Sequence, residues 1–352
     1  GGLELRGQDL FGHQTIADLA TVVRTYSGGE AEQGPISGAC PLTPIQHAFF
    51  ARDLPRPSHY NQYMTLEVDR NVDLDALCDA LGAIIAHHDA LRLRYRLYEG
   101  RWQHEAPTSS VPFAIEDLRG WPEAIQEGVY IQQALSHQES LDLENGPTVR
   151  ATLYQFTNGW RLLWSIHHLV VDSISWGILL EDLRLAYRQT RLGDPVSLAP
   201  TTSSLKAWAE RMQVYAKGPA SAALPYWCAL PSAASLPLEH PDGVATIANL
   251  QYEVGALDGG ETLSLLERAN RAYATRVNEL LVTALGQAVT AWAGQSTCLV
   301  DLESHGRADL FSGIDLSRTV GWFTAIYPVC LIKTSGDDPG AAIRVVRDQL
   351  RA

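Results

Sequence analysis

The stretch WSIHHLVVDSISW, residues 164–176, places two adjacent histidines at the end of an apolar run. Successive side chains of a β-strand point to opposite faces, so Trp164, Ile166 and His168 are expected on one face and His167 on the other. The two histidines therefore cannot have the same task. Either one could be a general acid or base at the strand end, with the other a structural group. For each taken singly, a core histidine bonded to the backbone is the simpler alternative.

Asp172 lies immediately before a predicted helix that runs from Ser173 to about residue 191. An aspartate in this position commonly caps the helix by accepting hydrogen bonds from the first backbone amides. A buried carboxylate also needs a cation, and the segment ALRLRY supplies Arg92 or Arg94 at a predicted helix-to-strand junction. The sequence therefore favours a structural ion pair for Asp172 over a role as a general base.

The segment VDLESHGR, residues 300–307, carries titratable or charged side chains at alternate positions. On a strand, these residues would share one face: Asp301, Glu303, His305 and Arg307. This face is either the solvated side of a half-buried strand or part of a cleft. In a cleft, burial would make one carboxylate a better proton acceptor. Spacing alone leaves both interpretations open.

The composition indicates a globular, soluble protein that does not bind nucleic acid. The 352 residues are 46% apolar and 19% charged, and this length suggests two lobes, each with its own core. The formal net charge of −13 argues against nucleic acid, because phosphate contacts need clustered Lys and Arg. The sequence patterns of phosphate loops, dinucleotide sites, serine-hydrolase elbows and zinc metalloprotease helices do not occur.

The cysteine pattern favours a cytoplasmic protein. The cysteines are odd in number, far apart and free of Cys-x-x-Cys spacing: Cys40, Cys78, Cys228, Cys298 and Cys330. They indicate reduced core thiols, with neither a disulfide framework nor a zinc site. The sequence shows neither a signal peptide pattern nor an apolar segment typical of a membrane span, so no membrane partner is expected.

Changes in pattern divide the chain into four segments. Residues 1–26 end in a predicted helix behind Thr15 as its N-cap, and the Gly/Ser/Glu-rich residues 27–40 read as a linker. Residues 41–195 combine helical and strand patterns and predict a first α/β lobe. The pattern then restarts, and residues 196–352 predict a second α/β lobe.

Ordered motifs between residues 41 and 333 resemble the condensation superfamily of nonribosomal peptide synthetases. HHLVVDSISW resembles the His-His-x-x-x-Asp-Gly motif, PLTPIQHAFF the opening motif, and HYNQYMTLEV the first strand. NELLVTALGQAVTAW is similar to the helix before the second active-site strand, VDLESHGR to the EGHGRE motif, and DLSRTVGWFTAIYPV to the R-T-V-G-W-F-T motif. The Ser175-Trp176 ending resembles the epimerization branch of the superfamily.

The resemblance implies a chloramphenicol-acetyltransferase-like α/β (α+β) fold, in which two lobes form a V around a central channel. Residues 1–26 resemble the C-terminal end of a peptidyl carrier domain. Residues 41–195 would then be the N-terminal lobe of an epimerization domain, and 196–352 an incomplete C-terminal lobe. The expected partners are a carrier domain and adjacent synthetase domains. No cofactor or metal of its own is implied, because the substrate arrives on the carrier's phosphopantetheine arm.

The resemblance also assigns roles to residues. His168 matches the catalytic histidine, and Glu303 the glutamate that epimerization domains require. Asp172 matches a structural aspartate paired with the arginine at Arg92. The supporting residues implied by the resemblance are His167, Asp172, Arg92, Ser175 and Trp176.

The implied activity is inversion of a carrier-bound aminoacyl or peptidyl thioester from L to D at Cα, a step of antibiotic biosynthesis. Inversion needs a base on one face of Cα, a proton donor on the other, and stabilisation of the enolate between them. His168 and Glu303, contributed by different lobes, would supply the two groups.

Three departures from the family motifs keep other functions open. Ser173 and Ser304 replace glycines and Ala308 replaces a glutamate, and the chain stops at Ala352, before the closing region of the family's second lobe. One alternative is an amide-forming condensation domain, which needs no second acid or base at Glu303. The other is a non-catalytic relic that only docks a carrier protein.

Overall fold

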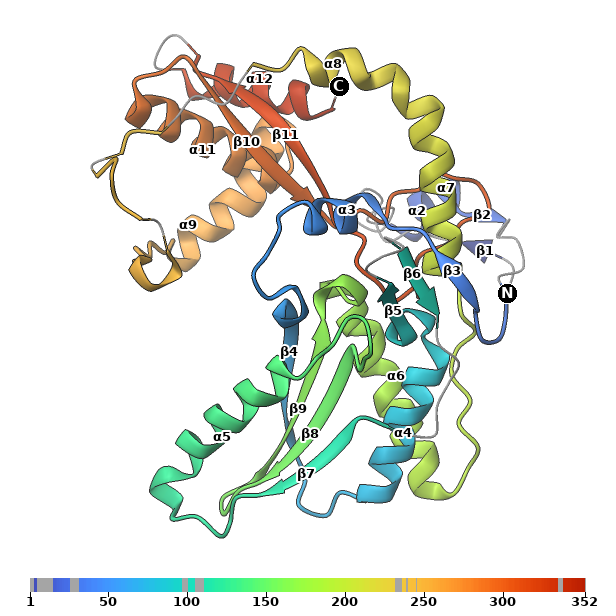
Figure 1. The fold of residues 1–352 in the computed structure, drawn as a ribbon. Coiled ribbons are helices and arrows are strands. Elements are labelled where there is room, and N and C mark those ends of the chain that lie inside the picture. Colours follow the sequence, from blue (N-terminus) through green and yellow to red (C-terminus); the bar gives the residue numbers. More distant parts are fainter. Residues whose placement is uncertain are drawn as a thin grey trace. The chain divides into compact units, whose positions relative to one another are not determined.

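A computed structural model describes residues 3–4, 15–25, 32–96, 101–104, 111–231, 236–238, 240–244, 246–334 and 338–351. The chain forms two compact units (Figure 1). The first comprises Gly1–Ser221 and Ser304–Ala325, and the second Ala222–Glu303 and Ile326–Ala352. Both units combine helices and strands, as the sequence predicted.

A four-stranded sheet organises the first unit. Its strand order is β4-β9-β8-β7, with antiparallel pairs β4–β9 and β9–β8 and a parallel pair β7–β8. The strands are β4 (Asn61–Val68), β9 (Trp160–His167), β8 (Val149–Gln155) and β7 (Phe113–Asp117). The β4–β9 register sets Asn61 opposite His167, so the histidine motif follows the end of a central strand.

Helices cover both faces of this sheet (Figure 1). Leu162, Trp164 and Ile166 belong to a core that includes buried residues of α4 (Leu74–His87) and α6 (Ser173–Leu192). Leu163, between them in sequence, packs in a smaller core with α5 (Glu123–Glu139). The strand alternation predicted for this segment is confirmed, because apolar residues of both parities are buried on opposite faces.

The first unit also contains a three-stranded sheet, two further helices and a short N-terminal segment. A second sheet has the order β3-β6-β5; helix α7 contacts β3, and Phe50 of α3 stacks on Tyr95 of β5. The bounds are β3 (Gly38–Cys40), β6 (Arg101–His104), β5 (Leu93–Arg96), α3 (Pro44–Phe50) and α7 (Leu205–Lys217). Near the N-terminus lie β1 (Leu3–Glu4), α2 (Ile16–Val22) and β2 (Arg24–Thr25), and Thr15 caps α2 as expected.

The second unit is built on β10 (Thr297–Ser304) and β11 (Ala325–Ile332). Buried residues of these strands pack with Val282 of α11 (Val277–Ala293) and Val346 of α12 (Pro339–Arg351). The other helices are α8 (Leu224–Cys228), α9 (Gly259–Leu263), a π-helical turn (Ser264–Ala269) and α10 (Asn270–Tyr273). The segment NELLVTALGQAVTAW, expected to be a helix from its family resemblance, forms most of α11.

Two stretches belong to the first compact unit although the sequence placed them in the second lobe. In residues 196–221, Leu205 and Trp208 of α7 are buried in the first unit's core. In residues 304–325, Trp322 and Phe323 are buried in the same core. The motif DLSRTVGWFTAIYPV is therefore divided: Trp322 and Phe323 pack in the first unit's core, and strand β11 begins only at Ala325.

Two expectations about chemistry and location can be compared with the structure. All five cysteines are free thiols, as predicted, but the expected core position is wrong for Cys228, which is exposed, and holds fully only for Cys40 and Cys298. Within the described part of the chain, no helix combines the length and apolar character needed to cross a bilayer.

Candidate functional site

The histidine motif lies at a change of backbone structure. Strand β9 ends at His167, a 3₁₀ turn covers His168–Val170, and Asp172 is the N-cap of α6. His168 therefore lies just beyond the pleated strand, although the sequence treated it as the strand's last residue. The turn separates the two imidazoles, which have different partners and different exposure.

His167 is a buried structural histidine. Its Nε2 donates to the carbonyl of Pro57 at 2.8 Å, while its Nδ1 accepts from the amide of Leu169 at 3.2 Å. Burial lowers the pKa of His167 from 6.5 to about 4, and the bond to Pro57 opposes this shift only in part. The ring is therefore neutral near pH 7 and holds the turn that carries His168.

The buried His167 predicts a loss of stability in acid. Between about pH 6.5 and pH 4 the unfolded chain binds a proton at this position and the folded protein does not, so stability falls as the pH falls. The shift corresponds to about 3 kcal/mol. Urea unfolding measures how much the free energy of unfolding falls between pH 7 and pH 4. We expect this fall to be smaller by about 3 kcal/mol in His167→Gln than in the parent. An equal fall in the free energy of unfolding in the parent and in His167→Gln would contradict the interpretation of His167 as a buried, neutral histidine.

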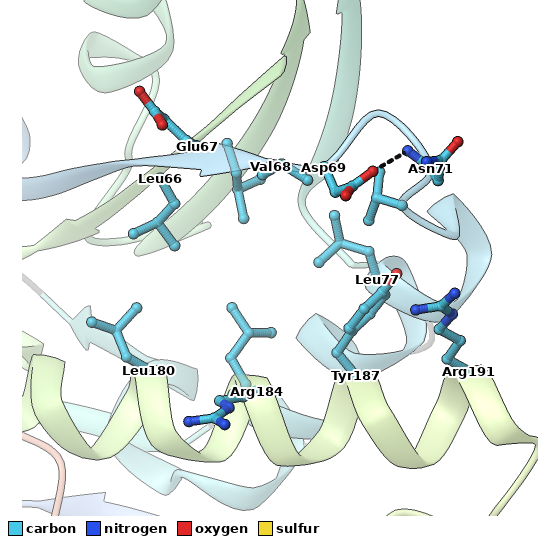
Figure 2. A pocket seen from close by; sticks show the side chains of 13 residues that line it. Leu66, Glu67, Val68, Asp69, Asn71, Leu77, Leu180, Arg184, Tyr187 and Arg191 are labelled. Carbon is cyan, nitrogen blue, oxygen red and sulfur yellow. Dashed lines mark hydrogen bonds between the residues drawn. The ribbon is translucent and has the colours of Figure 1, made fainter. Parts of the chain in front are cut away.

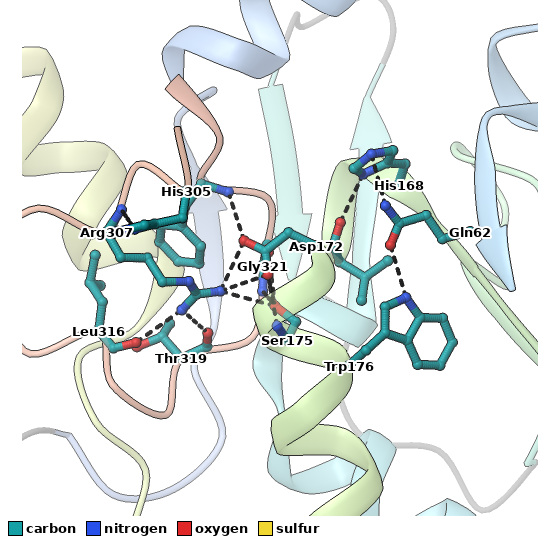
Figure 3. A network of polar contacts seen from close by, with 12 residues as sticks. Gln62, His168, Asp172, Ser175, Trp176, His305, Arg307, Leu316, Thr319 and Gly321 are labelled. Atoms are coloured by element: carbon teal, nitrogen blue, oxygen red, sulfur yellow. Dashed lines mark hydrogen bonds and ion pairs between the residues drawn. The ribbon is translucent and has the colours of Figure 1, made fainter. Parts of the chain in front are cut away.

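His168 is half-buried and held by four neighbours, of which Figure 3 labels Gln62. Its ring stacks on Tyr60 with centroids 5.4 Å apart and planes at 10°, and Trp322 lies against it at 4.4 Å. Its Nδ1 is 2.9 Å from the carbonyl of Val171, and its Nε2 is 3.0 Å from the amide nitrogen of Gln62. Both ring nitrogens have a hydrogen-bond partner, so the orientation of the ring is fixed.

Asp172 is buried and has no acceptor capacity to spare. One carboxylate oxygen caps α6 by accepting from the amide and hydroxyl of Ser175, both at 2.7 Å. The other accepts from the amide of Phe323 at 3.3 Å. Both oxygens bind Nη2 of Arg307, at 2.9 and 3.0 Å. The helix-cap and ion-pair interpretations are both correct for this residue, because the same carboxylate does both.

The partner of Asp172 is not Arg92, and this corrects the expected pairing. Arg92 lies in the turn after α4, where Nη1 donates to the carbonyls of Ile85 and Ala86 at 3.2 and 2.8 Å. Arg307 instead returns to Asp172 from 135 residues away in the sequence. Sequence proximity within one lobe favoured Arg92, whereas the long-range path of residues 304–325 brings Arg307 to the carboxylate.

Arg307 connects the segment 304–325 to α6. Its Nη1 donates to the carbonyls of Leu316 and Thr319 at 2.9 and 2.6 Å, in addition to the contacts of Nη2 with Asp172 and Ser175. Burial lowers the pKa of the guanidinium, and the nearby Asp172 carboxylate opposes that shift. The side chain thus neutralises a buried carboxylate and fixes the loop that carries Trp322.

Gly306 explains why the segment ESHGR needs a glycine before the arginine. Its φ is +67°, and a Cβ at this position would overlap with the carbonyl oxygen of Phe323. Only glycine has both the required backbone conformation and the space. The close approach positions Arg307 for the bond to Asp172.

Glu303 lies near the end of β10 in the second unit, and its side chain is exposed. The alternation predicted for this strand holds up to Ser304: Asp301 and Glu303 are exposed, and Leu302 is half-buried between them. It ends there, because Arg307 leaves the solvated face and its side chain is only 7% exposed in the pair with Asp172. Arg307 therefore does not share the exposed strand face of Asp301 and Glu303 that the sequence predicted for it.

The three departures from the family motifs lie at accessible positions. Ser173 and Ala308 are exposed, and Ser304, the last residue of β10, is half-buried. Ser173 is the first residue of α6, where its side chain leaves the Asp172 cap bonds intact. The side-chain partners of His168 in the described structure come from other positions, Gln62 among them.

Sequence reasoning missed two glutamines that hold the motif. The buried Gln46 of α3 donates to the carbonyl of Leu169 at 2.9 Å. Gln62 of β4 contacts His168 through its amide nitrogen and Trp176 through its amide oxygen. Both residues were inside quoted motifs, PLTPIQHAFF and HYNQYMTLEV, but no local pattern shows which distant group a glutamine will bind.

Among the described residues, one group of three could bring metal-ligating atoms together, within 4.8 Å: His87, His88 and Asp182. Asp182 already accepts from His88 at 3.0 Å and from the guanidinium of Arg318. The guanidinium competes with a cation for the same carboxylate. We therefore interpret the group as a buried ion-pair cluster.

A cavity of about 490 Å³ lies between β4, α4 and α6 (Figure 2). Its lining is largely apolar, with charged side chains added: Leu66, Glu67, Val68, Asp69, Asn71, Val72, Leu77, Leu162, Leu180, Leu183, Arg184, Tyr187 and Arg191. Leu66 is four residues along β4 from Gln62, or about 13 Å at the rise of a strand. The cavity is thus separate from the polar cluster at His168.

Comparisons with known sequences agree with this architecture. The Condensation domain family matches residues 36–352. A linear gramicidin synthase of Brevibacillus parabrevis is 40% identical over 360 residues, which cover 99% of this chain and 7% of that protein. Chondramide synthase of Chondromyces crocatus is 41% identical over 361 residues, covering 100% of this chain and 9% of that protein. The chain thus spans less than a tenth of the length of these relatives.

Solved structures give the same result. The epimerization domain from the third module of tyrocidine synthetase B has a TM-score of 0.81 and 34% identity, covering 92% of this chain and 73% of that one. The first condensation domain of the calcium-dependent antibiotic synthetase has a TM-score of 0.66 and 21% identity, covering 90% and 74%, a likeness of fold alone. The chain therefore belongs to the condensation-domain family of nonribosomal peptide synthetases, and it is similar in sequence and fold to an epimerization domain.

Proposed function

We propose that this domain inverts Cα of an aminoacyl or peptidyl thioester carried on the phosphopantetheine arm of a carrier protein. His168 is one acid/base group and Glu303 the other. The observation that carries the proposal is the immobilised imidazole of His168, whose Nδ1 is bonded to the carbonyl of Val171. The 34% identity to an epimerization domain over 92% of the chain supports this activity.

The reaction needs two proton transfers. One group removes the Cα proton, the C–H electron pair moves into the thioester to form an enolate, and the other group delivers a proton to the opposite face. For the neutral imidazole of His168, Nε2 takes the proton, because the contact of Nδ1 with Val171 assigns the ring hydrogen to Nδ1. Tyr60 and Trp322 restrict the ring to one plane, which favours a single direction of attack.

The second acid/base group in this proposal is Glu303, which lies near the end of β10. The exposed carboxylate of Glu303 is accessible to a substrate.

Amide-forming condensation is the second candidate, favoured by the family that matches residues 36–352. In that reaction a base assists attack of an amine on the thioester carbonyl, and the carrier thiol leaves. Such a reaction uses His168 but gives no task to Glu303. The isotope content of Cα distinguishes the two activities, because amide formation leaves the Cα–H bond intact.

The test is exchange at Cα in deuterated buffer. A holo carrier protein loaded with an L-amino acid is incubated with the 352-residue chain, and the cleaved amino acid is examined by mass spectrometry and chiral chromatography. We expect one deuterium at Cα and a growing D fraction. A matched reaction receives an acceptor aminoacyl carrier. An amide product without deuterium would identify condensation, and absence of both products would support the carrier-docking alternative.

A further inference from the structure

We propose that Trp176 and Gln62 are positioning residues that fix where His168 carries its proton, with hydrogen on Nδ1 and a lone pair on Nε2. The inference concerns hydrogen bonds within the first unit. Its catalytic consequence rests on the proposed function, but its primary test does not require a substrate.

The indole of Trp176 fixes the orientation of the Gln62 amide. An indole N–H donates only, so the atom of Gln62 that it contacts at 2.8 Å must be the oxygen. The amide nitrogen then faces Nε2 of His168 at 3.0 Å (Figure 3). Because an amide N–H₂ also only donates, Nε2 must accept, and it carries the lone pair.

The contact on the other side of the imidazole favours the same tautomer. Nδ1 of His168 is 2.9 Å from the carbonyl oxygen of Val171, and a carbonyl only accepts. Nδ1 therefore carries the hydrogen. These contacts form a hydrogen-bond series in which every donor points the same way: Trp176 donates to Gln62, Gln62 to His168, and His168 to the carbonyl of Val171. The donor at each step sets which atom of the next residue accepts.

The fold holds the start of this series rigidly. Trp176 is 4% exposed, and its ring packs edge-on against Trp164 at 5.4 Å. Gln62 lies on β4, opposite Ile166, on the face that packs against α6. Turning the Gln62 amide over would set two donors against each other at Trp176. The tautomer of His168 is therefore coupled to a buried tryptophan.

This arrangement keeps a lone pair on Nε2 of His168, the form that can accept a proton, although the partner of Nδ1 is a backbone carbonyl and not a carboxylate. The orientation of the ring comes from Tyr60 and Trp322, and the position of the proton comes from Gln62 and Val171. The Gln62 N–H lies on the lone pair of Nε2. It must move aside when a substrate Cα–H approaches, so Gln62 both presets the base and covers it in the free protein.

The primary test is nitrogen NMR of the chain labelled in its histidine rings at pH 8, with the His168 signals assigned by their loss in His168→Gln. We expect His168 to be the Nδ1–H tautomer by about tenfold or more. Trp176→Phe keeps an aromatic ring against Trp164 but removes the N–H, so the amide can turn and the tautomer ratio should fall about tenfold. A parent protein with hydrogen on Nε2 would overturn the proposal without any variant.

Gln62→Glu gives a second, opposite change. A carboxylate only accepts, so it can keep the bond to Trp176 while its second oxygen demands hydrogen on Nε2, and we expect both ring nitrogens of His168 to be protonated. Trp164→Phe is the matched control, because Trp164 contacts only the ring of Trp176 in this series and leaves its N–H in place, and it should retain the parent tautomer. If Trp176→Phe behaves like this control, the inference is wrong.

Turnover separates this inference from the proposed function. In Trp176→Phe, kcat for Cα exchange should fall roughly tenfold, with KM for the aminoacyl carrier unchanged, because substrate contacts are not altered. The parent tautomer with no exchange at all would refute the proposed function and leave the hydrogen-bond series established. If Trp176→Phe changes the tautomer of His168 but leaves kcat unchanged, the tautomer does not control the rate of Cα exchange.

Discussion

Replacing Glu303 by glutamine is expected to slow inversion of an L-aminoacyl carrier by about 10²–10⁴-fold, the usual contribution of a general acid or base. His168→Gln should cause a loss of the same size, because each group serves one face of Cα. In each variant, deuterium wash-in from one starting enantiomer should survive, since the base on that face remains. Exchange and inversion are therefore measured separately from L and D substrates.

Asp301→Asn is the matched control for Glu303→Gln. Both changes convert an exposed carboxylate on the same face of β10 to an amide, and the two residues are two positions apart. The control should invert the substrate at the parent rate. If Glu303→Gln does so as well, then this face of β10 is only solvated surface, and the mechanism with two acid/base groups is wrong.

Replacing Arg307 by methionine is expected to lower the free energy of unfolding by roughly 3–5 kcal/mol, because it leaves the Asp172 carboxylate buried without its cation. Asp172 and Arg307 are each 7% exposed at the side chain, so water cannot replace the lost partner. The midpoint of urea unfolding, followed by tryptophan fluorescence, measures the change. The double variant with Asp172→Asn should lose less than the sum of the two single losses.

The exposed pair of Arg119 and Asp117 provides a contrast. Its N–O distance of 2.7 Å is shorter than that of the buried pair, but its side chains are 51% and 53% exposed. Arg119→Met should leave the unfolding midpoint close to that of the parent. A parent-like unfolding midpoint for Arg307→Met would show that the buried network with Asp172 does not hold the first unit together.

Local sequence predicted the elements that present the site. The period of two along Trp164–His167 correctly separated the faces of β9, and the position of Asp172 correctly predicted the start of α6. Both features depend on neighbours within a few residues, where backbone geometry fixes which side chains meet. The family resemblance added an expected role for His168 and Glu303 that spacing alone left open.

The error about Arg92 has a physical cause. A buried carboxylate requires a cation, and the sequence offered several arginines, but charge alone does not distinguish among them. The choice depends on the close approach of Gly306 to Phe323, which turns residues 304–325 back onto the first unit. No local period reports such a return of the chain.

The sequence by itself determined the mixed helix and strand content, the differing faces of the strand that ends at His167, and the capping position of Asp172, because each is set by interactions over a few residues. Only the tertiary structure decided that Arg307 neutralises Asp172, across 135 residues, and that Trp176 orients Gln62 against His168, across 114. Hydrogen-bond partners at such separations are selected by how the layers pack. In the sequence alone, a donor has many possible acceptors, and the packing of the folded chain selects one of them.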